Sequence, residues 1–523
     1  MNTDLTAQQK DYAIFLPAIS GFYATFIGKQ RREEYVERTR IPSNFPNDVE
    51  SLNWLNRNDG MFQYNWSLYS AGHAELDINK DSPKEDMIRN RDRNTSWLLG
   101  DSGGFQIGKG VWEGDWKDPN CPKAKKKREQ VLRWMDEYMD YGMILDIPAW
   151  VARSPQGVKA TGISTYQEAV NATRINNDYF MKNRNGNCKF LNVLQGENHA
   201  DAEDWYQQMK DYCDPKKYTD HFNGWSMGGQ NMCDIHLALK RIVALRFDGL
   251  LEKGKHDFMH FLGTSKLEWA TLLTDVQRAV RKHHNENFTI TFDCASPFLA
   301  TANGQIYCEL ETKDRSKWVY RMVPSIDDKG LAQDLTPFGQ AFVRENKHGS
   351  FKDSPITTGL TAKDVCIYAP GDLNKVGKEG KTSWDSFTYG ILMAHNVYMH
   401  IRAVQEANSL ATMEFENYKL DWRNWQKKGK KLNQESLWTP RNMLMFNTLV
   451  EEVFDPNCPN PFKLIDDAKP FLDDVSNNKH KDHDSAFKNS AASMFFDEEI
   501  EQQVEGEFDE IQEKALTDLV EEL

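Results

Sequence analysis

The sequence predicts an α/β fold, a (β/α)8 TIM-type barrel, and two observations carry this prediction. Short apolar runs typical of buried strands alternate with longer amphipathic segments typical of helices, as in the βα units of a parallel sheet. Eight such runs can be counted, and eight strands close a barrel of this kind. With 523 residues, the chain also has room for a large insertion after the last catalytic strand and a helical C-terminal extension.

The strand-like runs and the segments between them follow in regular order. The expected strands are AIFLPAI (13–19), MFQYNWSLYS (61–70), SWLLG (96–100), GMILDIP (142–148), CKFLNVL (188–194), GWSMG (224–228), HDFMHFLG (256–263) and FTITFD (288–293). Helices are expected near residues 129–141, 164–182, 200–213, 233–251 and 265–284.

The regular alternation ends after Asp293, and this sets the expected domain boundaries. Residues 1–300 are predicted to form the catalytic barrel. Residues 301–418 read as an insertion with short β-like pieces and a closing helix at 386–418. Residues 419–470 form a Trp- and Lys-rich accessory segment, and 471–523 a linker followed by an acidic tail with helical periodicity.

The net charge of −14 is concentrated in that tail, where residues 497–523 hold twelve acidic residues and one lysine. The rest of the chain is close to neutral and carries local runs of basic residues. Such runs are often plain solvated surface, but phosphate binding needs only local positive potential. The candidate contacts to a nucleic-acid backbone are Arg89, Arg91, Lys125, Lys126, Lys127, Lys427 and Lys428.

No apolar run is long enough to cross a membrane, and the N-terminal residues lack the pattern of a signal peptide. The eight cysteines are scattered singly, as suits a reducing compartment. We therefore expect a soluble cytoplasmic protein with no membrane partner, and a homodimer stays open.

Polar residues cluster where the predicted strands end, which is the face on which barrels of this kind place their active sites. A lone strand-end aspartate is more often a helix cap, and a lone DSGG is a turn. Several such sites in register favour an active site instead. They are Asp101 to Gln106, Asp146, Gln195 to Glu197, Met227 to Gln230, Gly263, and Asp293 with Cys294.

Between residues 95 and 300 these motifs carry a resemblance. DSGGFQ, LDIP, NVLQGE, GWSMGG, HFLGTS and FDCASP, in that order, resemble the successive active-site motifs of the tRNA-guanine transglycosylase superfamily. DSGGFQ and FDCASP are the most specific of them. The resemblance implies a pentosyltransferase that exchanges a guanine base by double displacement.

Cleavage of an N-glycosidic bond builds positive charge on the sugar, so a carboxylate below C1′ can stabilise that charge and then form a covalent intermediate. Asp293 suits this role as the nucleophile. A second carboxylate must donate a proton to the leaving base and accept one from the incoming base. The resemblance assigns that general acid/base role to Asp101. No redox cofactor or ATP is required.

Recognition of guanine needs acceptors for its N1–H and N2–H groups and donors for O6. The resemblance implies that Asp146 supplies the acceptor and that Gln195 faces O6. Phe105 matches the aromatic residue that stacks on the base, although a plain core role is the alternative for Phe105 and Leu262. The full set of expected base-binding residues is Ser102, Phe105, Asp146, Gln195, Gly228, Gly229, Gln230 and Leu262.

The sequence departs from the family at its zinc element, three cysteines followed by a histidine. Here the corresponding positions are Asp364, Cys366, Ala369 and His395, so at most three of four ligands remain. Structural zinc normally has four ligands. The sequence thus makes zinc at Cys366 and His395 doubtful, with His395 expected to be a packed or hydrogen-bonded helix residue.

Loss of the zinc element weakens the case for tRNA as substrate, and the pattern is more similar to the phage and bacterial branch that inserts 7-deazaguanine derivatives into DNA. The expected partners are DNA and a base similar to preQ0 or preQ1, in the host cytoplasm if the chain is phage-encoded. A tRNA enzyme of queuosine or archaeosine synthesis is the nearest alternative. A non-catalytic partner subunit and a carboxylate glycoside hydrolase also stay open.

Overall fold

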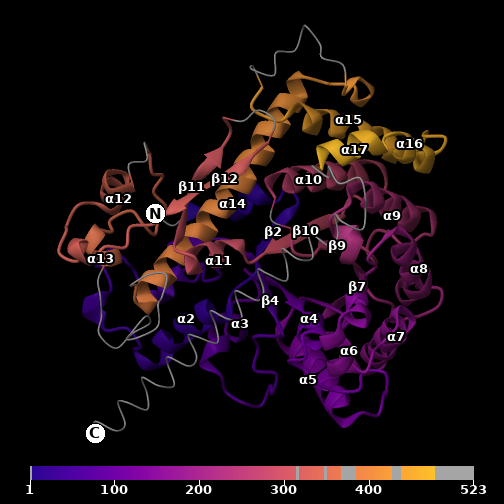
Figure 1. The fold of residues 1–523 in the computed structure, drawn as a ribbon, viewed down its shortest axis with the longest axis horizontal. Helices are drawn as coiled ribbons and strands as arrows, with labels where there is room; N and C mark the ends of the chain where they lie inside the picture. Colours follow the sequence, from indigo (N-terminus) through magenta and orange to yellow (C-terminus); the bar gives the residue numbers. More distant parts are fainter. Residues whose placement is uncertain are drawn as a thin grey trace.

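The computed structural model describes residues 3–264, 266–313, 317–346, 350–366, 384–426 and 437–476. An eight-stranded, all-parallel sheet lies at its centre and is surrounded by helices (Figure 1). In these ranges no helix has both the length and the apolar composition needed to cross a membrane.

Each of the eight expected strands overlaps a strand of this sheet. The strands are β2 (Ile14–Pro17), β4 (Trp66–Ser70), β5 (Trp97–Asp101), β6 (Tyr141–Met143), β7 (Lys189–Leu194), β8 (Gly224–Met227), β9 (Phe258–Phe261) and β10 (Thr289–Cys294). Their order is β2-β10-β9-β8-β7-β6-β5-β4, and every pairing is parallel. A parallel bridge between Ala18 and Leu68 joins the two ends. The sheet is therefore a nearly closed barrel, consistent with the predicted TIM type.

The helices that follow the strands lie outside the barrel. They include α5 (Pro122–Tyr138), α7 (Tyr166–Asn183), α8 (His199–Met209), α9 (Ile235–Phe247) and α10 (Leu267–His283). Side chains cap three of their N-termini: Thr165 in a capping box with Glu168, then Asn198 and Asp234. Helix α5 begins seven residues before the expected start, because Pro122 suits a first helical position and its lysine-rich first turns carry little apolar periodicity.

Shorter elements fill the βα connections and the N-terminal part. A two-stranded parallel pair, β1 (Thr3–Asp4) and β3 (Phe62–Gln63), lies apart from the barrel sheet. The short helices are α1 (Thr6–Gln9), α2 (Gly21–Glu33), α3 (Asp86–Arg89), α4 (Gly104–Gly108) and α6 (Pro155–Thr161).

Buried tryptophans explain how a polar chain builds this core. Trp205 and Trp225 are fully buried beside the strands, and each indole N–H finds a backbone acceptor, Val193 O and Leu250 O respectively. Because the one polar atom of each ring is satisfied, the large apolar surface is buried without an unpaired donor.

The chain after β10 forms a hairpin and further helices. The hairpin strands β11 (Gln305–Glu311) and β12 (Val319–Pro324) coincide with the two β-like pieces of the sequence. The helices are α11 (Ser296–Ala302), α12 (Phe338–Asn346), α13 (Ala362–Cys366), α14 (Ser386–Asn417), α15 (Arg441–Phe454), α16 (Pro461–Asp467) and α17 (Lys469–Val475). The long helix α14 packs along the hairpin and α10, while α15 packs on α10 and both α16 and α17 on α9 (Figure 1).

Of two expectations for the C-terminal part, one falls on residues that the structure describes and one does not. Helix α17 continues to Val475, beyond the point at which a linker was expected, because Phe471 and Leu472 are buried against the neighbouring helices. The acidic tail lies outside the described residues. All eight cysteines are free.

Candidate active site

The carboxyl ends of the barrel strands bring the predicted polar residues to one face. Asp101 ends β5 and pairs in register with Ser70 at the end of β4, and Asp293 pairs with Leu16 near the end of β2. Gln195, Gly228 and Leu262 directly follow β7, β8 and β9, and Asp146 stands three residues after the end of β6. Since all eight strands run in the same direction, these residues surround one mouth of the barrel.

Asp293 is held by two N–H groups on a single oxygen. Its Oδ1 accepts hydrogen bonds from the backbone N–H of Gly263 at 2.9 Å and from His260 Nε2 at 3.1 Å. The other ring nitrogen of His260 lies 2.9 Å from Thr291 Oγ1, whose hydroxyl can donate to it. Because a carboxylate can only accept, the imidazole proton lies on Nε2, directed at Asp293, and the Thr291 hydroxyl donates to Nδ1.

The pKa of Asp101 depends on its burial and on the charge of Asp293. Burial raises the pKa of the Asp101 carboxyl, the hydrogen bond from Ser70 Oγ at 2.6 Å opposes the increase, and the charge of Asp293 adds to it. Asp293 is thus close enough for its charge to disfavour the ionised form of Asp101. Such coupling is typical of sites that hold a proton on one of two carboxyls.

Asp146 is a second buried carboxyl with a raised pKa. Burial raises the pKa of Asp146 to about 7, the hydrogen bond from Gln195 Nε2 at 2.8 Å opposes this, and the charge of Asp101 contributes to the increase. The segment after Asp101 packs against it: a Cβ at Gly104 would lie only 2.7 Å from the carbonyl oxygen of Asp146. Glycine at 104 therefore permits the close approach of these two strand ends.

Gln195, Gly228 and Leu262 converge beside Asp146. A Cβ at Gly228 would lie 2.9 Å from Gln195 Nε2 and 3.2 Å from Leu262 Cδ1. Ser102 is buried next to Asp101, whereas Phe105 is half-buried and contacts Trp150 with ring centroids 6.0 Å apart. The predicted base-binding residues on β6 to β9 thus form one connected group.

The Gly229–Gln230 turn is only partly available to a base. Gly229 has φ +54°, and a Cβ there would collide with the carbonyl oxygen of Gly196. The backbone N–H of Gln230 donates to that same carbonyl at 2.7 Å. The backbone amide of Gln230, a predicted base-binding residue, is therefore engaged within the protein. The backbone amide of Gly229 remains the candidate for base binding.

The sequence matches no protein-family model and no curated protein.

Two of the predicted phosphate-binding residues lie elsewhere. Arg91 is buried at the opposite end of the strands, where it donates to Asp140 Oδ2 and to the carbonyl oxygens of Ser96 and Tyr138. Arg89 donates to Glu85 and to two backbone carbonyls. Both guanidinium groups brace loops of the fold, so the structure does not bring them to the barrel mouth.

The lysines of α5 are placed closer to the site. Lys125 and Lys126 are exposed, and the Nζ of Lys127 lies 4.6 Å from the ring centre of Trp112, the residue that a Cβ at Gly103 would meet. Lys427 and Lys428 lie outside the described residues.

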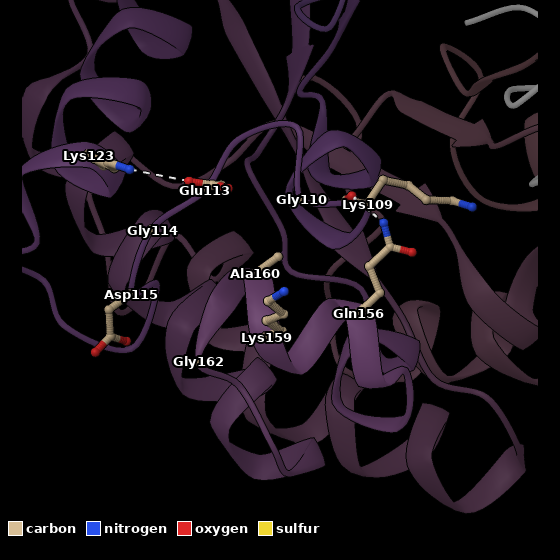
Figure 2. Close-up of a pocket in the computed structure, with 10 residues that line it drawn as sticks. All are labelled: Lys109, Gly110, Glu113, Gly114, Asp115, Lys123, Gln156, Lys159, Ala160 and Gly162. Atoms are coloured by element: carbon tan, nitrogen blue, oxygen red, sulfur yellow. Dashed lines mark hydrogen bonds and ion pairs between the residues drawn. The ribbon is translucent and has the colours of Figure 1, made fainter. Parts of the chain in front are cut away.

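A lysine-lined pocket adjoins the segment that follows Asp101 (Figure 2). It has a volume of about 530 Å³ and is bounded by α4, α5 and α6, with Lys109, Lys123 and Lys159 among its lining residues. Glu113 pairs with Lys123 at 3.3 Å, and the Nζ of Lys109 lies 5.4 Å from the ring centre of Phe105. Lys109 therefore brings one positive charge close to the expected base-stacking residue, while Glu113 and Asp115 also line the pocket.

Cys366 and His395 do not form a zinc site with each other. His395 lies 2.8 Å from Ser354 Oγ through Nδ1 and 2.8 Å from the carbonyl oxygen of Tyr307 through Nε2, so both ring nitrogens have protein partners. Burial lowers the pKa of His395 to about 4, with the Tyr307 hydrogen bond opposing. Cys366 Sγ contacts the carbonyl oxygen of Ile326. These residues do not fit the family's metal, and Ala369 lies outside the described residues.

Sequence reasoning missed two members of the site, Ser70 and His260. Ser70 ends an expected strand, and its proximity to Asp101 follows only from the β4–β5 register. A histidine within the apolar run HDFMHFLG was a signal, because a buried polar side chain in a strand needs a specific partner.

Proposed function

We propose that this chain is a guanine transglycosylase that exchanges guanine in DNA for a 7-deazaguanine derivative similar to preQ0 or preQ1. The observation that carries the proposal is the arrangement of three carboxyls at one end of the barrel, on or just after β5, β6 and β10. Asp293 is held by N–H donors, while Asp101 and Asp146 have raised pKa values and interact through charge. Such separated environments suit one nucleophile and one proton carrier.

In the first half-reaction Asp293 attacks C1′ of the nucleotide as the bond from C1′ to guanine N9 breaks. Both donors of Asp293 contact Oδ1, so we assign the attack to Oδ2. The electron pair of the broken bond goes to the base, which takes a proton from Asp101. In the second half-reaction the incoming base loses its N9 proton to Asp101, N9 attacks C1′, and Asp293 leaves. Two inversions give net retention.

The base would be read by the residues around Asp146. Its carboxylate accepts from guanine N1–H and N2–H, and Gln195 turns its amide from Asp146 toward O6. Phe105 and Leu262 cover the faces of the ring, and Ser102, Gly228 and the Gly229 amide line its edge. A base held in this way must leave the helical stack of duplex DNA.

The lysine-lined pocket provides the path for the nucleic-acid backbone in this proposal. Lys109, Lys123 and Lys159 line this pocket, and Lys109 lies near Phe105, the residue proposed to stack on the base. Replacing Lys109 and Lys159 by alanine should make the plot of log binding constant against log salt concentration less steep. The magnitude of its negative slope should fall by about two, one for each phosphate that no longer contacts a lysine. An unchanged slope would remove the pocket from the proposal.

In the same proposal residues 301–418 are an insertion that follows the last catalytic strand, and the helices from residue 419 onward are an extension of the barrel. Both lie beyond the part of the sequence that carries the resemblance to transglycosylases.

The decisive experiment is exchange of radiolabelled guanine into duplex DNA and into tRNA by the purified full chain. Label in DNA is the expected result. Label in tRNA alone would replace this function by tRNA modification, and label in neither, under conditions where a 7-deazaguanine base is also not incorporated, would favour a non-catalytic subunit.

A further inference from the structure

Three potential metal ligands meet on the outside of the barrel, between α8 and α9. His199 is the first residue of α8, Asp234 is the N-cap of α9 and His236 is the second residue of α9. One ligand atom from each lies within 4.8 Å of the others, and within the described ranges no other group of three such side chains meets this criterion.

The ring of His236 has the arrangement of a metal ligand with a supporting carboxylate. Its Nε2 lies 2.8 Å from Asp466 Oδ1 on α16, and Lys240 Nζ binds the same carboxylate at 2.9 Å. Because a carboxylate can only accept, the proton of the neutral ring is on Nε2, and Nδ1 carries a lone pair. The residue is 4% exposed, and Nδ1 has no hydrogen-bond partner in the structure.

An unsatisfied nitrogen in a buried ring costs free energy, so this lone pair needs an explanation. Histidines that ligate metals usually donate their other ring N–H to a carboxylate, as His236 does to Asp466. The packing of α16 on α9, which brings Asp466 to His236, thus supplies the outer partner that a metal site requires.

Asp234 and His199 complete a mixed nitrogen and oxygen donor set. Asp234 Oδ1 accepts from the backbone N–H of Leu237 as the helix cap, while Oδ2 lies 2.7 Å from His199 Nε2. The two imidazole rings stack with centroids 5.7 Å apart. Tetrahedral zinc with bonds of about 2.1 Å separates its ligand atoms by about 3.4 Å, so only small side-chain movements are needed to admit the ion.

We propose that His199, Asp234 and His236 bind one zinc-like divalent transition-metal ion, with Asp466 as the supporting carboxylate and water in the remaining position. The site is separate from the three carboxyls of the barrel mouth and does not depend on the proposed function. Its role is structural: Gln230 Nε2 lies 3.3 Å from Asp234 Oδ2, so the ion would brace the Gly229–Gln230 turn from behind.

The test is metal binding by the full chain after removal of metal with a chelator. Titration with Zn²⁺ by calorimetry should give one equivalent per chain, and Co²⁺ should give the absorption of a four- or five-coordinate ion. His199→Ala, at a half-exposed position, should weaken binding at least 100-fold, and Asp466→Asn about 10- to 100-fold.

His283→Ala is the matched control, because His283 pairs with the carboxylate of Glu451 at 3.2 Å but belongs to no group of three potential metal ligands in the described structure. It should bind zinc like the unaltered chain. Thermal unfolding without metal checks that each variant is folded. Equal zinc affinity of folded His199→Ala and the unaltered chain, or no stoichiometric binding at all, would reduce the cluster to a hydrogen-bond network and overturn the proposal.

Discussion

The carboxyl groups on the two sides of the barrel mouth have different surroundings. On the β10 side, Asp293 receives an imidazole N–H and a backbone N–H on one oxygen. On the β5 and β6 side, burial raises the pKa of Asp101 and of Asp146, and the charge of a neighbouring carboxylate adds to each increase. Aspartate thus occupies one position where two N–H groups donate to it and two positions where its pKa is raised.

The difference shows how a barrel can divide chemical roles between identical side chains. Hydrogen-bond donors directed at a carboxylate favour its charged form, whereas desolvation and a like charge favour the neutral form. The donors come from β9 and the loop after it, and the neighbouring charges from β5 and β10, so the division depends on which strand ends meet at the mouth of the barrel. Five variants test it, from the largest expected effect to the smallest.

Asp293→Asn should abolish the covalent protein–DNA adduct and lower guanine exchange by about 10⁴-fold or more, as expected for loss of a nucleophile. Asparagine keeps the shape and an acceptor for Gly263 and His260. The adduct is measured on a denaturing gel after incubation with labelled DNA. Asp257→Asn, which alters a strand-end aspartate at the opposite end of β9, should retain exchange. A persistent adduct in Asp293→Asn would assign the nucleophile elsewhere.

Asp101→Asn should lower exchange by about 10²- to 10⁴-fold, the usual contribution of a general acid or base. The defect should be much smaller for adduct formation from DNA containing 7-methylguanine, since that base leaves without needing a proton. Adduct formation is compared for the two substrates with equal amounts of the variant. An equal defect on both would mean that Asp101 does not protonate the leaving group.

Asp146 should make the binding of guanine depend on pH. With a pKa of about 7, the carboxyl must lose a proton before it can accept two N–H groups, so affinity should rise about tenfold per pH unit below 7 and level off above it. Calorimetry between pH 5.5 and about 8 measures this dependence. In Asp146→Asn, binding should be weak and independent of pH; a retained pH dependence would place the titrating group elsewhere.

The same raised pKa has a consequence for stability. The folded state holds the proton of Asp146 more tightly than the unfolded chain, so this contribution is greatest at low pH and is lost as the pH rises from about 4 through about 7. Asp146→Asn should therefore increase the free energy of unfolding at pH 8 by about 2–4 kcal/mol. Equal unfolding curves for both proteins at that pH would contradict the buried charge.

His260→Gln should have the smallest effect, a decrease in kcat of about tenfold with little change in KM, because glutamine can still donate to Asp293 but is not oriented by Thr291. Thr291→Val, which removes the hydroxyl that holds Nδ1 of the His260 ring, should produce a similar change in kcat. A change confined to KM would show that His260 affects substrate binding and not the position of Asp293.

Much of the fold could be predicted because its signals are local. Each strand was marked by an apolar run, and DSGGFQ, LDIP and FDCASP stand at strand ends where the structure has them. The start of α5 was missed because its lysine-rich first turns carry no apolar periodicity. The roles of Arg89 and Arg91 were also missed, because a basic run does not reveal whether its side chains face solvent or brace a loop.

The sequence by itself determined the order of strands and helices and the residues at the strand ends, since these depend on neighbours two to four positions apart. Only the tertiary structure decided that Gly263 and His260 hold Asp293, that Gln195 binds Asp146, and that Asp466 meets His236 across 230 residues. Those interactions depend on strand register and helix packing, which join distant segments and leave no periodic trace in the chain.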